Sequence, residues 1–193
     1  MEKGKPEGEK LGWRLLESDY PVVTPWLRVR RDRVAIEGQG EITYTYVQGF
    51  GAVGVVPVTS EGEMVLLRQY RYTVDDWCLE VPAGGMHDAG DKSLEQVARD
   101  ELREEIGAEC DDLRYVGWFY AAVGSSSQPF HVYLALDVRL TSTLQHEQTE
   151  HIEVMHMPTR DALALVKAGE MRDGVSALSV LLCEPLLREL GYV

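Results

Sequence analysis

The most constraining feature of this sequence is one amphipathic segment, Ser93 to Ile106, followed by Gly107. On a helical wheel at about 100° per residue, one apolar arc gathers Leu94, Val97, Ala98, Leu102 and Ile106. Glu101 and Glu105 lie inside this arc, and Glu104 lies at its edge. Burying an unpaired carboxylate is costly, and neighbouring like charges add to that cost. The segment therefore predicts a helix that turns its acids toward something able to neutralise them.

Two interpretations of these glutamates remain open at this point. Glutamate is a good helix former, so the three residues could be ordinary surface side chains. Alternatively, the i, i+3, i+4 spacing stacks three carboxylates that converge on hard divalent cations, with oxygen ligands of the kind that Mg²⁺ or Mn²⁺ prefers. Gly84 and Gly85 allow close backbone approach just upstream, so the Gly84 carbonyl could be a further ligand.

The rest of the chain predicts more strands than helices, without regular crossover helices between the strands. Residues 1–10 are mostly Gly, Pro, Lys and Glu and predict a disordered tail. Two further helices are expected over Thr159–Ala168 and Gly174–Leu190. Strands are expected over Trp26–Ile36, Glu41–Val47, Phe50–Val58, Met64–Tyr72, Leu113–Tyr120, Phe130–Val138 and Ile152–Met157. This pattern predicts an α+β fold with a mixed sheet flanked by helices.

Charge and cysteine content narrow the functional classes. The formal net charge is −13, which argues against a nucleic-acid or membrane-surface binder because a phosphate backbone would be repelled. Three widely spaced cysteines, Cys78, Cys110 and Cys183, are typical of free thiols in a reducing compartment. The apolar runs are too short to span a bilayer and the N-terminus lacks an apolar signal region. We therefore expect a cytoplasmic protein.

The segment Gly85 to Ala108, GMHDAGDKSLEQVARDELREEIGA, resembles a Nudix box, G-x5-E-x7-R-E-U-x-E-E-x-G-U, where U is a bulky aliphatic residue. The resemblance extends to Leu67–Tyr72 and Leu79–Gly84, which are similar to the ADP-ribose pyrophosphatase branch of that family. The later runs Glu150–Val154 and Gly169–Gly174 are similar to the same branch.

The resemblance implies a fold, an activity and an assembly. The fold is a Nudix α/β/α sandwich over residues 51–193, with an N-terminal antiparallel β extension over residues 11–50 that makes a homodimer. The activity is Mg²⁺-dependent hydrolysis of ADP-ribose or a related nucleoside diphosphate sugar, with Mn²⁺ as a substitute metal. The partner is a small-molecule nucleotide. The metals would reverse the local field, which explains how an acidic protein binds an acidic substrate.

The resemblance also implies roles for individual residues. Glu101, Glu104, Glu105 and the Gly84 carbonyl are the implied metal ligands, and Glu105 also belongs to the catalytic set. A late-loop glutamate would act as base, with Glu150 slightly preferred over Glu147. Arg71 would hold a phosphate or a terminal ribose. Trp13 and Tyr44 match aromatic residues that stack on adenine, often across a dimer.

The sequence departs from the box at three places. Asp91 occupies the first Glu position and one extra residue stands near Lys92. Asp100 stands at the box arginine, which in the family orients the glutamates; we hypothesise a partial charge swap, with Lys92 or Arg103 compensating. Gln128 stands in a segment where relatives often carry an acid. Asp100 and Gln128 keep a second function open, a non-catalytic nucleotide-binding module. A third possibility is a housecleaning hydrolase of nucleoside triphosphates or dinucleoside polyphosphates, against which the resemblance of the Gln69–Arg71 strand and of the N-terminal extension argues.

Overall fold

The computed structural model describes residues 5–87, 89–141 and 151–193, which form two compact units. Unit 1 comprises the chain up to Gly49 together with Ala122–Gln128, and unit 2 comprises Phe50–Ala121 and Pro129–Val193. Within the described residues, no helix combines the length and the apolarity needed to cross a bilayer.

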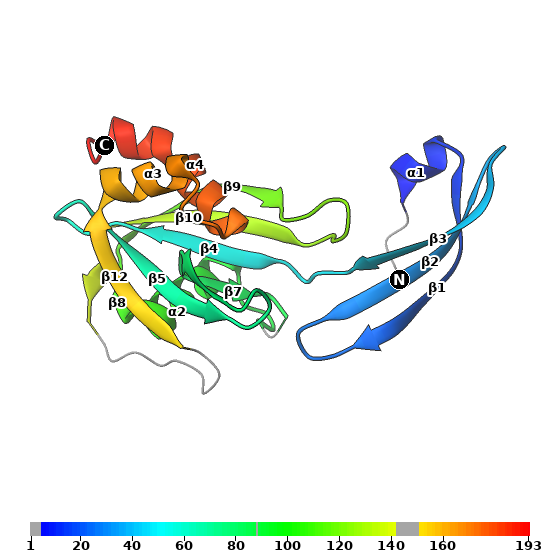
Figure 1. The fold of residues 1–193 in the computed structure, drawn as a ribbon, viewed down its shortest axis with the longest axis horizontal. Coiled ribbons are helices and arrows are strands. Elements are labelled where there is room, and N and C mark those ends of the chain that lie inside the picture. Colours follow the sequence, from blue (N-terminus) through cyan, green and yellow to red (C-terminus); the bar gives the residue numbers. More distant parts are fainter. Residues whose placement is uncertain (1–4, 88, 142–150) are drawn as a thin grey trace. The chain divides into compact units, whose positions relative to one another are not determined.

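Unit 1 is built on a three-stranded antiparallel meander, β1 (Trp13–Val23), β2 (Arg28–Ile36) and β3 (Gly40–Val47) (Figure 1). The expected N-terminal antiparallel β extension is therefore confirmed. The segment 122–128 joins this unit because the Val47 N–H donates to the Ser125 carbonyl (2.8 Å) and the Ser127 N–H donates to the Val47 carbonyl (3.0 Å).

The N-terminal segment differs from the expected disordered tail in residues 6–10, which form the short helix α1 (Pro6–Lys10). Pro6 stands in the first turn, where its fixed φ suits a helix and its missing N–H is not needed. Lys10 pairs with Glu7 one turn earlier, at 2.6 Å. Local signals of this kind are weak in a polar segment, which explains why composition alone predicted disorder.

Unit 2 contains a mixed four-stranded sheet in the order β7-β4-β10-β9, with β4 and β10 parallel and the other pairs antiparallel. A three-stranded antiparallel sheet has the order β12-β5-β6, and β8 pairs with β11. The strands are β4 (Ala52–Pro57), β5 (Glu63–Arg71), β6 (Asp76–Glu80), β7 (Ala83–Gly85), β8 (Ala108–Glu109), β9 (Asp112–Tyr120), β10 (Pro129–Leu136), β11 (Arg139–Leu140) and β12 (Ile152–Pro158). The helices are α2 (Leu94–Ile106), α3 (Thr159–Ala168) and α4 (Gly174–Glu189).

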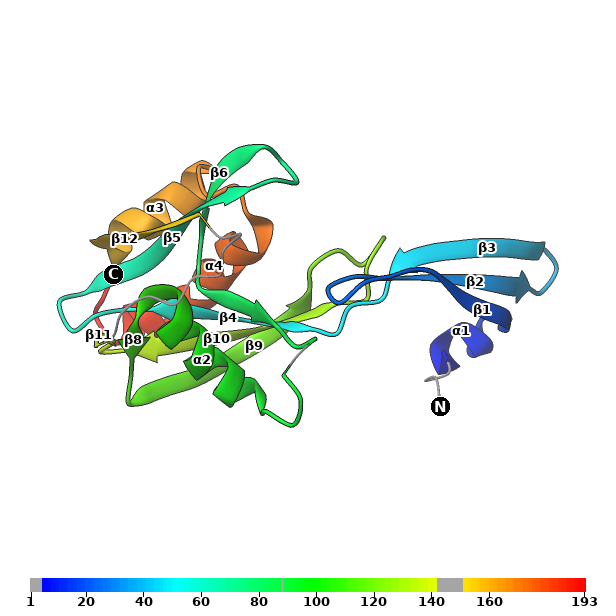
Figure 2. The same cartoon turned by 90° about the horizontal axis from the view of Figure 1, so that it is seen from below.

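The side chains of β4 alternate between two cores, which shows that helices cover both faces of the sheet. Ala52 and Val56 pack with Val180 and Leu187 of α4 in one core. Val53 and Val55 pack in the other core, with Val97, Ala98, Leu102 and Ile106 of α2. Figure 2 shows α2 on one side of β4 and β10, with α3 and α4 on the other. The expected α/β/α sandwich is confirmed.

Candidate functional site

Local sequence signals define both ends of α2. Ser93 caps the N-terminus: its Oγ accepts from the Gln96 N–H at 3.2 Å, and the Gln96 side chain accepts from the Ser93 N–H at 2.7 Å. This reciprocal pair is a capping box. Gly107 ends the helix in the left-handed region, at φ 65°. The observed helix therefore confirms the predicted one and sets the rotation of its acidic side chains.

Glu105 is buried, as the wheel predicts for a residue inside the apolar arc; only 7% of its surface is exposed. Its Oε2 accepts a hydrogen bond from the Ala83 N–H at 2.8 Å. Ala83 begins β7, which pairs with the central strand β4. A backbone donor to a carboxylate stabilises the charged form and offsets part of the cost of burial. Glu105 thus connects the end of α2 to the glycine-rich segment.

Glu101 lies directly against the backbone of Gly84. A Cβ atom placed on Gly84 would come within 1.8 Å of Oε1 of Glu101, so the Glu101 carboxylate would have to move. Gly84 stands in β7, opposite Val53 of β4, so the strand cannot move away without breaking the sheet. The absence of a side chain at Gly84 therefore lets the Glu101 carboxylate approach the main chain in its observed position.

Glu104 shares a small cavity with Glu101. The cavity has a volume of about 80 Å³ and is lined by Gly85, Ala89, Lys92, Val97, Asp100, Glu101 and Glu104. The Glu104 side chain is 46% exposed and lies 3.7 Å from Arg103. The described residues contain no group of three or more His, Cys, Asp or Glu side chains already gathered as a metal site. Glu104 lies near Arg103 and Glu105 accepts from the Ala83 N–H, while Glu101 lies one helical turn before both of them.

The donor set nevertheless fits a hard divalent cation. The side chains of Glu101 and Glu104 offer carboxylate oxygens to one cavity, and Gly84 brings a main-chain segment against Glu101. No sulfur or imidazole ligand lines that cavity among the described residues. Oxygen donors of this kind suit Mg²⁺ or Mn²⁺ rather than zinc.

Arg71, expected to bind substrate, ends β5 and makes a bidentate ion pair with Glu80 of β6. Its Nε donates to Oε1 at 2.8 Å and its Nη2 donates to Oε2 at 2.5 Å. Glu80 is 6% exposed, whereas the Arg71 side chain is 46% exposed. The hydrogen bonds to Glu80 raise the pKa of Arg71 above its ordinary value. Sequence reasoning gave Glu80 no role, although a charged residue between Leu79 and Val81 of an apolar run signals a buried partner.

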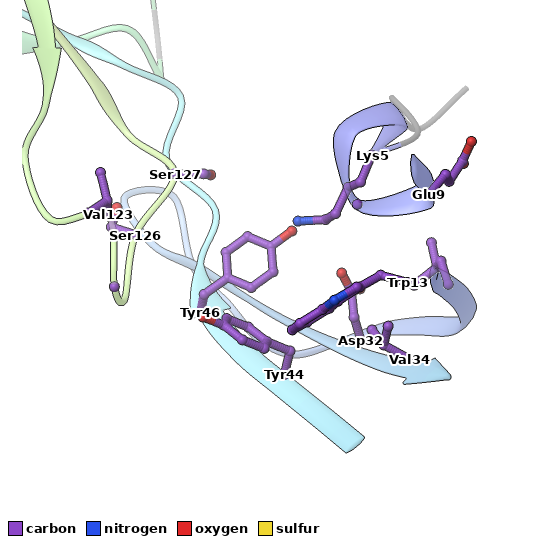
Figure 3. A pocket seen from close by; sticks show the side chains of 13 residues that line it. Lys5, Glu9, Trp13, Asp32, Val34, Tyr44, Tyr46, Val123, Ser126 and Ser127 are labelled. Carbon is purple, nitrogen blue, oxygen red and sulfur yellow. The ribbon is translucent and has the colours of Figure 1, made fainter. Parts of the chain in front are cut away.

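Trp13 and Tyr44, expected to stack on a base, line one cavity of unit 1. The cavity has a volume of about 370 Å³. Tyr46, Asp32 and Lys5 also line it, together with Val123, Gly124, Ser126 and Ser127. Figure 3 shows the rings of Trp13, Tyr44 and Tyr46 around this hollow. The structure thus brings the two predicted aromatic residues together in a single copy of the chain.

Comparison with known proteins identifies the family. The NUDIX domain model matches residues 50–177. The chain belongs to the Nudix family. It is 33% identical over 131 residues to an ADP-ribose pyrophosphatase of Bacillus subtilis (strain 168), covering 67% of this chain and 70% of that protein.

A second Nudix relative is an ADP-ribose pyrophosphatase of Mycobacterium tuberculosis (strain H37Rv), 31% identical over 154 residues, covering 79% of this chain and 74% of that protein. A crystal structure of an ADP compounds hydrolase superposes with a TM-score of 0.79 at 18% identity, covering 94% of this chain and 97% of that one. At this level of identity, the match to the crystal structure supports the fold alone.

Asp100, which replaces the Nudix box arginine, has two cationic neighbours in the structure. Asp100 lies between two cations: Oδ2 is 2.9 Å from Nζ of Lys92, and Oδ1 accepts from Nη2 of Arg103 at 2.5 Å. The hydrogen bond from Lys92, followed by that from Arg103, holds the pKa of Asp100 below its ordinary value. Both residues proposed as compensating cations therefore contact Asp100, and Lys92 comes from the turn where this box has its extra residue.

Three residues singled out by the sequence remain: Glu147, Glu150 and Gln128. Glu147 and Glu150, the proposed bases, fall outside the described residues. Gln128 belongs to unit 1, where it packs so closely on Gly49 that a Cβ atom added to Gly49 would lie 2.3 Å from the Gln128 Cβ. The Gln128 N–H donates to the Ser126 Oγ at 3.1 Å. These contacts give Gln128 a packing role in the segment 122–128.

Proposed function

We propose that this chain hydrolyses the diphosphate bond of ADP-ribose or a related nucleoside diphosphate sugar. Water would add to one phosphorus and the bridging P–O bond would break, giving a nucleoside monophosphate and a sugar phosphate. The observation that carries the proposal is the approach of two box glutamates to one backbone segment: Glu101 lies against Gly84, and Glu105 accepts from Ala83. The two relatives named ADP-ribose pyrophosphatase support this substrate class.

Glu101, Glu104, Glu105 and the Gly84 carbonyl are the proposed ligands of Mg²⁺, with Mn²⁺ as a substitute. When bound, the cation would neutralise the diphosphate and stabilise the leaving phosphate. Lys92 and Arg103 hold Asp100 beside these ligands, so the acid that replaces the box arginine does not add an uncompensated charge.

The other proposed roles belong to side chains of the protein. Arg71 uses two of the five guanidinium N–H groups for Glu80, and we propose that the others bind a phosphate or ribose oxygen. A glutamate of the late segment, Glu150 in preference to Glu147, would take the proton from the attacking water. Trp13 and Tyr44 would stack on the base.

Two alternatives make different demands on the site. A non-catalytic nucleotide-binding module is suggested by Asp100 and Gln128. Asp100 pairs with two cations, which weakens the argument for this module from Asp100. Gln128 has a packing role in unit 1, which weakens the argument from Gln128. A housecleaning hydrolase of nucleoside triphosphates or dinucleoside polyphosphates would share the metal ligands and differ in substrate.

We further propose a homodimer in a reducing, cytoplasmic compartment. Unit 1 exposes large apolar side chains, including Trp26 (74% exposed) and Val23 (61%), which are typical of a protein interface when grouped. Cys78, Cys110 and Cys183 are all free thiols, as expected where disulfides do not persist.

The test is to incubate the full chain with ADP-ribose and Mg²⁺ and to measure AMP release. Wild type and Glu95→Gln should release AMP, because Glu95 lies on the same helix but pairs with Arg99. Glu101→Gln should lose most of the activity. Retained ADP-ribose binding without turnover in the wild type would favour the binding module, and faster hydrolysis of nucleoside triphosphates would favour the housecleaning enzyme.

A further inference from the structure

The register of the unit 1 sheet places one buried acid at the centre of its aromatic face. Asp32 of β2 stands opposite Ser18 of β1 on one side and opposite Tyr44 of β3 on the other. Only 1% of its surface is exposed. A strand aspartate buried this deeply is unusual, because its charge must be balanced and its oxygens must find donors.

The two oxygens of this carboxylate have different surroundings. Oδ1 accepts from Ser18 Oγ at 2.6 Å and from Arg30 Nε at 2.7 Å. Arg30 is itself 3% exposed and also donates to Ser18 Oγ at 3.0 Å, so the three side chains form one buried network. Within the part of the chain that the structure describes, Oδ2 of Asp32 is buried and has no hydrogen-bond partner.

The unpartnered oxygen belongs to a residue that lines the cavity of about 370 Å³. An acceptor left unsatisfied in a protein interior is costly, and for a charged group the cost is larger than for a neutral one. The cost is removed if a ligand in the cavity donates a hydrogen bond to Oδ2. Arg30 already balances the charge of Asp32, so the ligand need not be a cation.

The walls of the cavity indicate the shape of that ligand. Trp13, Tyr44 and Tyr46 present aromatic rings to it, and Lys5 lies with Nζ 4.6 Å from the centre of the Tyr46 ring (Figure 3). Flat rings stack on aromatic side chains, and a volume of this size accommodates a small ligand. The combination favours a planar heterocycle that carries an N–H donor.

We propose that Asp32 is the specificity-determining residue of this cavity, in which Trp13 and Tyr44 are already proposed to stack on the base. The base stacks on the aromatic walls, and its exocyclic amino group donates a hydrogen bond to Oδ2 of Asp32. This inference rests on the proposed function, since a nucleoside diphosphate substrate supplies the base. It adds a selection rule: bases with an amino group, such as adenine, bind, and purines without a donor at that position are disfavoured.

The first test changes the ligand and leaves the protein intact. Equilibrium dialysis of the full chain, without added metal, compares adenosine with purine riboside, which lacks only the amino group. Adenosine should bind on the order of tenfold to a hundredfold more tightly, because purine riboside leaves the carboxylate oxygen unpaired. Equal affinities, or no adenosine binding, would overturn the inference whatever the behaviour of any variant.

The second test uses Asp32→Asn with Asp19→Asn as the matched control. Asp19 of β1 pairs with Arg31 of β2, as Asp32 pairs with Arg30, but the Asp19 side chain is 48% exposed and does not line the aromatic cavity. The ratio of the Kd of purine riboside to the Kd of adenosine should fall to one or below in Asp32→Asn, because the amide nitrogen would present a donor to the amino group of adenosine. It should be unchanged in Asp19→Asn.

These measurements separate this inference from the proposed function. Loss of the adenosine preference in the wild type with AMP release from ADP-ribose intact would overturn the pocket alone. A clear adenosine preference without AMP release would overturn the proposed hydrolysis alone. A preference retained in Asp32→Asn would show that another group recognises the base, and would remove the role given to Asp32.

Discussion

Reversing the ion pair between Lys92 and Asp100 tests whether this chain replaces the box arginine by a charge swap. The single variants are Lys92→Asp and Asp100→Lys, and the double variant exchanges the two charges. In the native chain Nζ of Lys92 is 2.9 Å from Oδ2 of Asp100, and Arg103 contacts the other oxygen at 2.5 Å. Each single variant therefore places like charges together, whereas the double variant restores an opposite pair.

The size of the effect follows from exposure. The Lys92 side chain is 54% exposed and that of Asp100 is 21% exposed, so water screens much of the Coulomb energy. Exposed pairs contribute about 0.2–1 kcal/mol, and repulsion in the reversed pair adds a similar amount. We expect each single variant to lower the free energy of unfolding by about 1–2 kcal/mol. The double variant should recover about half of this loss, because Arg103 then faces a lysine.

Urea unfolding and AMP release are the two assays. The loss of stability should shrink at high salt, since screening weakens partly exposed pairs. Each single variant should reduce kcat/KM on the order of tenfold to a hundredfold, because a small displacement of the neighbouring Glu101 misplaces the ligands, and the double variant should regain most of it. Exchanging Glu95 and Arg99, a pair at 2.9 Å on the same helix, is the matched control and should leave kcat/KM unchanged.

Additive effects would refute this reasoning. If the double variant loses the sum of the two single losses, Lys92 and Asp100 do not act as a pair in solution. If the singles lose stability but not activity, the pair stabilises the helix without positioning Glu101.

Three further outcomes are expected from the same site. Gly84→Ala should abolish most AMP release, since its Cβ would meet Oε1 of Glu101 at 1.8 Å; unchanged kinetics would contradict the close approach. Arg71→Ala should lower the free energy of unfolding in urea by about 2 kcal/mol, less than the loss of a fully buried pair, because it leaves the buried Glu80 without this partner; an effect near zero would count against that pair. The lowered pKa of Asp100 means that its stabilisation is complete above its ordinary pKa, near pH 4, and is lost as pH falls through the folded value. The stability difference between wild type and Asp100→Asn, measured by urea unfolding, should therefore vanish in acid, and a difference that grows in acid would reverse the assigned sign.

Much of unit 2 could be predicted because its signals are local or periodic. Ser93 and Gly107 define α2 through caps that involve neighbours in sequence, and α3 has the predicted bounds, Thr159–Ala168. The wheel also predicted the burial of Glu105. The family resemblance was readable for the same reason, since the box is one continuous segment.

Other features of the site depended on contacts between distant segments. The glycine-rich segment Ala83–Gly85 forms the strand β7, which is not among the strands expected from the sequence, because its pairing with β4 supplies hydrogen bonds that no local pattern reveals. Glu80 is buried because β5 brings Arg71 opposite its strand.

The sequence by itself determined which side chains this protein carries on each face of its helices and strands, because 3.6-residue and two-residue periods are properties of the chain. Only the tertiary structure decided that both Lys92 and Arg103 contact Asp100. It also decided that Asp32, an unremarked acid between two arginines, lies buried beside Tyr44 with one oxygen unpaired among the described residues. Strand register sets such pairings, and register depends on the whole sheet rather than on any single strand.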